Sequence, residues 1–176
     1  MDAPTLTRSW PALAAVGSGL LLLALGAGAL APSLGGPRST AEAVIAASLI
    51  LLGAAALGWA IGTLRCGRPV LPRIGMAAAL TSLLVCILAL AADPTRTSVA
   101  AVAAAALLLV IAGSFCALAV GRRGEAWRRD GRTGMIGMVV GSALVAALVT
   151  PALAATEVGR LAPDHGSHVL VDPHAH

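Results

Sequence analysis

Residues 98–120 read SVAAVAAAALLLVIAGSFCALAV, an unbroken run of apolar and small side chains without a charged residue. This run is longer than the roughly 20 residues that an α-helix needs to cross the hydrocarbon core of a bilayer. Four further segments are similarly apolar, at 11–31, 41–64, 74–92 and 134–155, and the one charged residue among them is Glu42 near the start of 41–64. A segment in lipid has to satisfy its own backbone hydrogen bonds. The sequence therefore predicts an all-α integral membrane protein, a bundle of five transmembrane helices.

The composition of the whole chain agrees with this prediction. Its 176 residues are 58% hydrophobic and 11% charged, and the mean hydropathy is +0.90. Soluble domains contain about 45–50% apolar and about 25% charged residues, and a chain this short has too little interior to hide such an excess from water. Its three cysteines form no CxxC pair, which argues against a zinc ribbon, a thioredoxin-like site or a c-type haem attachment site.

The basic residues indicate the orientation of the bundle. All 12 are arginine, and the pI is near 10.2. Aromatic residues make up only 2% of the chain, so the stacking side chains typical of nucleic-acid binding are missing. Nine arginines lie in 1–9, 65–73 and 121–133, and three lie in 32–40, 93–97 and 156–176. Because arginine favours the cytoplasmic side, we expect a cytoplasmic N-terminus (1–9) and an extracytoplasmic C-terminus.

The first apolar run is expected to stay as a helix rather than to be removed as a signal peptide. It is longer than the usual core of about 7–15 residues, and Pro32 would directly follow the Ala29-Leu30-Ala31 cleavage pattern. The alanine-rich, lysine-free composition resembles that of small membrane proteins encoded by high-GC bacterial genomes. We therefore expect a multi-pass protein of the bacterial inner (plasma) membrane.

Two small-xxx-small patterns occur within the spans, Gly58-x-x-x-Gly62 and Gly137-x-x-x-Gly141. Such patterns allow the backbones of two helices to approach closely. They are interpreted either as contacts within the bundle, which we favour, or as docking sites for a partner subunit.

The spans contain no ionisable residue well inside their apolar runs, although Glu42 and Glu157 lie at the edges. Ion-coupled transporters and proton pumps place such residues within the membrane, and intramembrane proteases and haem proteins need Asp, Ser-His or His groups there. The sequence also has no phosphate-binding glycine loop. We therefore expect no enzymatic activity, no haem and no nucleotide cofactor.

The C-terminal segment 156–176 has a different composition and is predicted to be a short, mostly irregular tail. It contains the patterns His165-x-x-His168 and His174-x-His176, together with Asp164 and Asp172. Short His-rich tracts are typical of metal binding, and imidazole is a common ligand of Zn and Cu. These six residues are the candidate metal ligands. Their affinity for the metal is expected to fall as the imidazoles become protonated at about pH 6. Docking of 169–171 on a partner, or a solvated tail with no ligand, are the alternatives.

A second group of possible metal ligands consists of sulfur atoms near the predicted cytoplasmic face. Thiolate and thioether ligands select Cu(I), but Met and Cys also fill gaps in apolar packing. Cys86 lies deeper in its span, about 12 Å from the level of Cys116 at about 1.5 Å per residue, so these two thiols are not expected to share one ion. The members of the inner group are Cys66, Met76, Cys116, Met135 and Met138.

These observations favour a non-enzymatic accessory or assembly subunit of a larger membrane complex, or a homo-oligomer, whose tail binds or presents Cu or Zn. One alternative is a small copper transporter that uses the tail, Cys86 and the inner Cys/Met group. A purely structural subunit without metal is another. In each case the lipid bilayer is a partner and nucleic acid is not.

Overall fold

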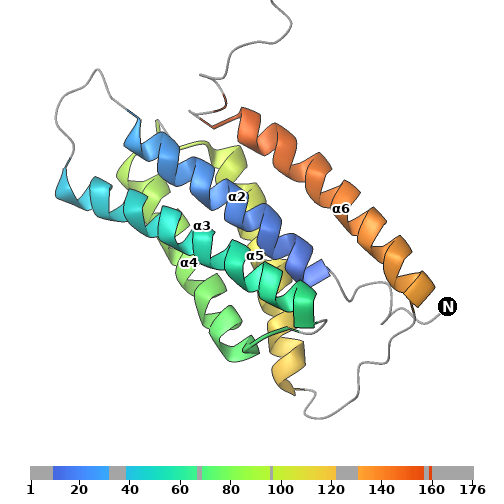
Figure 1. Ribbon diagram of the computed structural model, residues 1–176. Helices are drawn as coiled ribbons and strands as arrows, with labels where there is room; N and C mark the ends of the chain where they lie inside the picture. Colours follow the sequence, from blue (N-terminus) through green and yellow to red (C-terminus); the bar gives the residue numbers. More distant parts are fainter. Residues whose placement is uncertain are drawn as a thin grey trace, which may run out of the picture.

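The structure of the chain is a computed structural model that describes residues 10–31, 39–66, 69–95, 97–121, 131–156 and 159, with backbone alone at 131–136. Within these ranges the chain is helical and has no strand (Figure 1). The helices are α2 (Trp10–Leu30), α3 (Thr40–Cys66), α4 (Pro72–Ala92), α5 (Val99–Gly121) and α6 (Gly131–Ala154). The five predicted spans are confirmed as five helices, with ends that differ by a few residues. The predicted N-terminal segment and almost all of the predicted tail lie outside the described residues.

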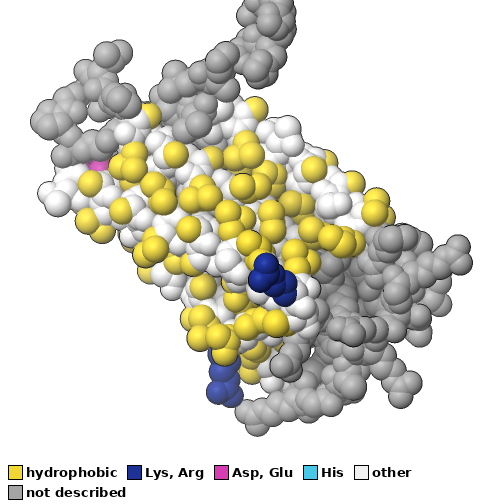
Figure 2. Space-filling model, in the orientation of Figure 1, with side chains coloured by type: hydrophobic (Ala, Val, Ile, Leu, Met, Phe, Trp, Pro, Cys, Tyr) yellow, Lys and Arg dark blue, Asp and Glu magenta, His cyan; other side chains and the backbone are white. Residues whose placement is uncertain are grey.

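All five helices are long and apolar enough to cross a membrane. The mean hydropathy of the best 18-residue window lies between 2.0 and 2.5 in each of them. Apolar side chains cover the visible flank of the bundle, whereas the basic and acidic side chains lie toward opposite ends (Figure 2). Arg65 and Arg73 lie beside the α3–α4 turn, whereas Glu42 begins α3 and Asp93 follows α4. This distribution is compatible with a multi-pass membrane protein.

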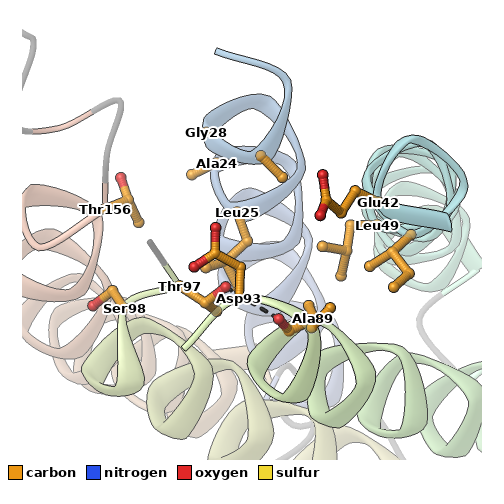
Figure 3. A pocket seen from close by; sticks show the side chains of 13 residues that line it. Ala24, Leu25, Gly28, Glu42, Leu49, Ala89, Asp93, Thr97, Ser98 and Thr156 are labelled. Carbon is orange, nitrogen blue, oxygen red and sulfur yellow. Dashed lines mark hydrogen bonds between the residues drawn. The ribbon is translucent and has the colours of Figure 1, made fainter. Parts of the chain in front are cut away.

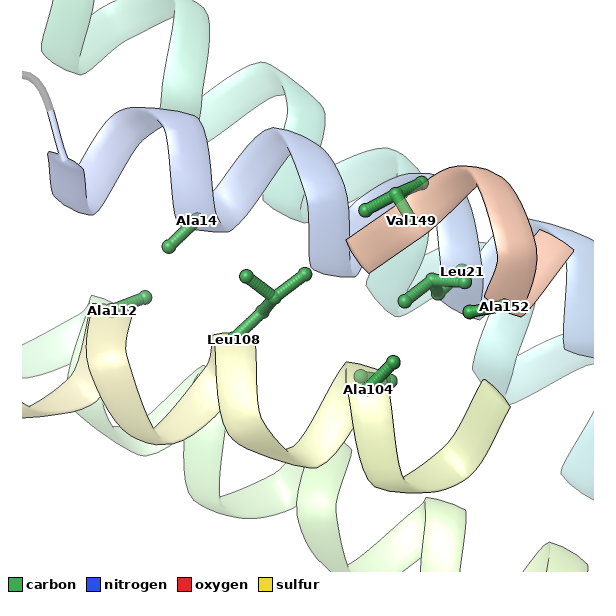
Figure 4. Close-up of a cluster of buried hydrophobic side chains, with 8 residues drawn as sticks. Ala14, Leu21, Ala104, Leu108, Ala112, Val149 and Ala152 are labelled. Carbon is green, nitrogen blue, oxygen red and sulfur yellow. The ribbon is translucent and has the colours of Figure 1, made fainter. Parts of the chain in front are cut away.

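Helix α2 occupies the centre of the bundle and contacts α3, α5 and α6 (Figure 1). In its apolar window 56% of the residues are buried, against 22% in α3, α4 and α6. One face of α2 joins α5 and α6 in a cluster of buried side chains that includes Ala14, Leu21, Leu108 and Val149 (Figure 4). Its other face joins α3, α4 and α5 in a second buried cluster. The members of the second cluster are Leu22, Leu25, Leu49, Cys86, Ala89, Ala101 and Val102.

Glycines allow α2 and α3 to pack with their backbones in contact. A methyl group added at Gly53 would lie 2.8 Å from the carbonyl oxygen of Gly19, and one added at Gly26 would lie 2.9 Å from the carbonyl oxygen of Ala46. In lipid the apolar surfaces gain little by leaving their solvent, so association depends on close van der Waals packing. Gly19, Gly26 and Gly53 therefore make the α2–α3 pair possible.

The two predicted small-xxx-small patterns have different surroundings. At Gly141 an added methyl group would lie 2.9 Å from Leu13 Cδ1, and the Trp10 indole N–H donates a hydrogen bond to the carbonyl oxygen of Gly137 at 3.2 Å. Gly137 and Gly141 therefore contact α2, in agreement with the interpretation that this pattern serves packing within the bundle. At Gly58, however, no atom lies within 4 Å of an added methyl group. The expectation of packing within the bundle is therefore wrong for Gly58, because that side of α3 faces outward.

Candidate functional site

A pocket lined by two carboxylates lies at the end of the bundle where α2, α4 and α6 end and α3 and α5 begin. It has a volume of about 60 Å³, which is enough for a few water molecules. The carboxylates of Glu42 and Asp93 lie on two sides of it, and Thr156 approaches from a third (Figure 3). Apolar side chains of α2 and α3, among them Leu25 and Leu49, form the deeper wall.

Glu42 is held at this position by the start of α3. The backbone N–H of Glu42 donates to Ser39 Oγ at 3.2 Å, and the backbone N–H of Ser39 donates to Glu42 Oε2 at 3.3 Å. This reciprocal pair is a capping box, which satisfies two backbone donors at a helix N-terminus. Its carboxylate also favours the positive end of the α3 dipole. The half-buried Glu42 side chain is therefore positioned on the rim of the pocket by local interactions.

Asp93 is positioned by the turn between α4 and α5. Its Oδ1 accepts hydrogen bonds from the backbone N–H of Thr95 at 3.2 Å and from Thr95 Oγ1 at 2.7 Å. The Thr97 hydroxyl donates to the carbonyl oxygen of Ala89 at 3.2 Å, and thereby ties the turn to the last turn of α4. The polar rim of the pocket thus consists of the start of α3, the end of α4 and the turn after α4, and local hydrogen bonds hold these segments in place.

Thr156 connects this pocket with the C-terminal tail. Its side chain is only 2% exposed, and its hydroxyl donates to the carbonyl oxygen of Leu153 at 2.7 Å. Thr156 Oγ1 in turn accepts a hydrogen bond from the backbone N–H of Gly159 at 3.2 Å. The chain therefore leaves α6 from a fixed point in the pocket wall.

The predicted metal ligands of the tail, His165, His168, His174, His176, Asp164 and Asp172, lie outside the described residues. In the part of the chain that the structure describes, no three His, Cys, Asp or Glu side chains lie together as a potential metal site. Glu42 and Asp93 offer carboxylate oxygens, which are acceptable ligands for Zn²⁺, but a structural zinc ion takes four ligands. The pocket would need further ligands to hold such an ion.

The predicted sulfur group is spread over different surroundings. Cys116 is buried beside a cavity between α2, α3, α4 and α5, whereas Cys66 is exposed at the last residue of α3. Met138 is 46% exposed on α6. Cys86 belongs to the second buried cluster, where its described neighbours are leucine, alanine and valine side chains. Cys116 is the one described thiol or thioether of this set that lines the cavity.

Sequence reasoning noted Glu42 as an edge residue but missed the pocket. The pattern Ser39-x-x-Glu42 just before an apolar run is a capping-box signature, so the fixed position of the carboxylate was accessible from the sequence. Its approach to Asp93 and Thr156 was not, because it depends on how three helix ends pack. No protein-family model, no curated protein and no solved structure matches this chain.

Proposed function

We propose that the protein is a non-enzymatic accessory or assembly subunit of a bacterial membrane complex, whose C-terminal tail binds or presents Cu or Zn. The observation that carries the proposal is the point where the tail begins. Thr156 lies in the wall of the pocket that Glu42 and Asp93 line, so the chain that continues to the four histidines leaves α6 beside two carboxylates. Imidazole and carboxylate together form a common ligand set for zinc.

Charge supports an extracytoplasmic position for this pocket. In the sequence, nine of the 12 arginines lie in 1–9, 65–73 and 121–133, and three lie in 32–40, 93–97 and 156–176. The positive-inside rule then places the α3–α4 turn in the cytoplasm and the tail outside the inner membrane. A metal presented there is accessible to an extracytoplasmic partner.

The role as a subunit is supported by the outer faces of the bundle. Helices α3, α4 and α6 carry large apolar side chains that point away from it, such as Leu51 (72% exposed), Leu80 (61%) and Val139 (62%). These faces are available to lipid and to the helices of a partner or of a second copy.

Metal binding by the purified full-length protein tests the proposal. The wild type, loaded with Zn²⁺ or Cu²⁺ by dialysis, should retain the metal at about pH 7.5 and release it at about pH 5.5, because protonated imidazole is not a ligand. Replacement of His165, His168, His174 and His176 by Asn should abolish this binding, whereas the control Cys86→Ala should leave it unchanged. Equal metal content in the wild type and the four-His variant would remove the metal claim.

Two further outcomes identify the alternatives. Copper uptake into vesicles that is lost in Cys86→Ala would favour the transporter. Purification with a larger complex, but without metal in either form, would favour a purely structural subunit.

A further inference from the structure

A second cavity lies within the apolar part of the bundle, between α2, α3, α4 and α5. Its volume is about 120 Å³. Most of its wall consists of small and apolar side chains, but Ser18, Ser82 and Cys116 also line it. These three side chains are 0%, 3% and 1% exposed, respectively. They bring two hydroxyls and a thiol to an otherwise apolar space at membrane depth.

The Ser82 hydroxyl, like that of Thr63, lacks the hydrogen bond within its own helix that several other hydroxyls of the spans make. Those of Ser48, Thr81 and Ser114 each donate to the carbonyl oxygen four residues earlier in their own helix, at 2.7, 3.0 and 2.7 Å. This is the usual way in which a helix satisfies such a group. Ser18 donates to the carbonyl oxygen of Ala15 at 3.2 Å. Ser82 makes no hydrogen bond with any described residue, although it is nearly fully buried on the cavity wall.

An unpaired hydroxyl in an apolar environment is costly, because it has lost its hydrogen bonds to water and gained none in the protein. Ser82 therefore has a hydrogen bond to offer to whatever enters the cavity. The Cys116 thiol, a weaker donor, also makes no hydrogen bond to the described part of the chain. A matching ligand carries hydrogen-bond acceptors. It is also neutral, since no described side chain in the cavity wall is charged and an ion at membrane depth would need a partner.

The size of the cavity indicates a ring. A cavity of about 150 Å³ with apolar walls holds one benzene molecule, and this cavity of about 120 Å³ accommodates a six-membered ring that extends through its outward side. One side of the wall includes residues of α3 and α4 that also face outward, Ala55, Ile74 and Ala78. A ligand can therefore reach the cavity laterally from the bilayer and leave its substituents between α3 and α4.

Gly75 keeps the space beside Cys116 and Trp59 accessible. A methyl group added there would lie 3.0 Å from Cys116 Sγ and 3.2 Å from two carbons of the Trp59 ring. The Trp59 indole is in turn fixed by its N–H, which donates to the carbonyl oxygen of Val70 in the α3–α4 turn. The wall thus presents a fixed aromatic ring on the side of the cavity where Gly75 and the Cys116 thiol lie.

We propose that this cavity binds the ring of a neutral, membrane-soluble quinone. A quinone has a benzene-sized ring, two carbonyl acceptors for the Ser82 hydroxyl and the Cys116 thiol, and no charge. It also partitions into the bilayer from which the cavity opens. This binding is independent of the metal chemistry proposed for the tail.

Fluorescence quenching tests the proposal, because Trp59 lines the cavity and quinones quench tryptophan. The protein in lipid nanodiscs is titrated with duroquinone, a fully substituted quinone. Quenching by free diffusion in lipid rises without saturation, whereas binding adds a saturable component, which we expect in the wild type. Ser82→Ala should weaken the apparent affinity about 2- to 10-fold, which corresponds to loss of one hydrogen bond. The control Ser114→Ala, whose hydroxyl is bonded within its own helix, should leave the affinity unchanged.

A second pair of variants separates occupancy of the cavity from effects on folding. Ala78→Leu adds volume at the outward side of the cavity, and Ala77→Leu adds the same volume at an exposed neighbour that does not line it. We expect Ala78→Leu to abolish the saturable component and Ala77→Leu to retain it. Quenching in the wild type without saturation would mean that the cavity holds water or lipid, and would overturn the proposal. So would saturable quenching that is the same in Ala78→Leu and in the wild type.

Discussion

Replacing Gly53 by alanine should destabilise the bundle, whereas the same change at Gly58 should not. Both glycines lie on α3, one turn or more from its ends. At Gly53 the new methyl group would lie 2.8 Å from the carbonyl oxygen of Gly19, 2.9 Å from Leu23 Cγ and 3.0 Å from the backbone nitrogen of Leu23. Two of these atoms belong to the backbone of α2, so the clash cannot be relieved by rotating a side chain. At Gly58 the methyl group meets no atom within 4 Å.

The size of the effect follows from this difference. Carbon atoms in favourable contact are about 3.5–4.0 Å apart, so the two helices have to separate by about 0.5–1 Å at Gly53. A gap of that size loses about a quarter to a half of the van der Waals energy of each contact between the two helices. Overpacking of a tight core costs about 1–3 kcal/mol. Gly→Ala also favours the helix by up to about 1 kcal/mol at both positions. The expected difference between the two variants is therefore about 1–3 kcal/mol, with Gly53→Ala the less stable.

The assay is reversible unfolding in mixed micelles with increasing fractions of denaturing detergent, followed by far-UV circular dichroism. Because the residue change and the helix are the same in both variants, their intrinsic helix propensity cancels. Equal free energies of unfolding for the two variants would refute the reasoning that backbone contact between α2 and α3 holds the bundle together.

Two further predictions concern a buried hydroxyl and the orientation of the chain. The Thr63 hydroxyl is buried without a hydrogen-bond partner, so Thr63→Val should raise the free energy of unfolding by about 1–3 kcal/mol. The control Thr81→Val loses a hydrogen bond to the carbonyl oxygen of Ala77 and should give no such increase. The same detergent titration measures both variants, and equal changes in the free energy of unfolding would contradict the prediction. Cys66 is exposed at the arginine-rich end of α3, so a membrane-impermeant maleimide should label it in inside-out vesicles and leave it unlabelled in right-side-out vesicles, with Cys66→Ser as the blank. Labelling of Cys66 only in right-side-out vesicles would reverse the proposed topology.

The helices could be predicted from the sequence because lipid imposes a simple rule. A charge-free run of sufficient length has to be helical, and residues 98–120 obey this rule without exception. The uniformly small and apolar composition of the spans also prevents a prediction of which helix faces pack together. Glycine and alanine occur on every side of each helix, so the pattern at Gly58 and Gly62 looked as suitable for contact as Gly53, which is the residue that meets α2. Only the relative rotation of α2 and α3 distinguishes them.

Of the candidate sites, the metal-binding tail stays a prediction from the sequence, because its ligands lie outside the described residues, whereas neither pocket could be predicted. The carboxylates of Glu42 and Asp93 are far apart in the chain, and each is explained locally by a helix end. Their approach is a consequence of antiparallel packing, in which α3 begins where α4 ends. The position of Ser82 on a cavity wall could not be predicted either, because serine in a span typically hydrogen-bonds to a neighbouring helix.

Small side chains have opposite consequences in two parts of this bundle. Between α2 and α3 they let the backbones meet, because each glycine faces the carbonyl of the other helix. Between α3 and α4 small residues and Trp59 line a cavity of about 120 Å³, which the alanine side chains of its wall leave unfilled. In water such a void would cost packing energy with no compensation. In a bilayer it can be filled from the side by a lipid-soluble molecule, so a span without ionisable groups can still form a binding site through the space that its small residues leave.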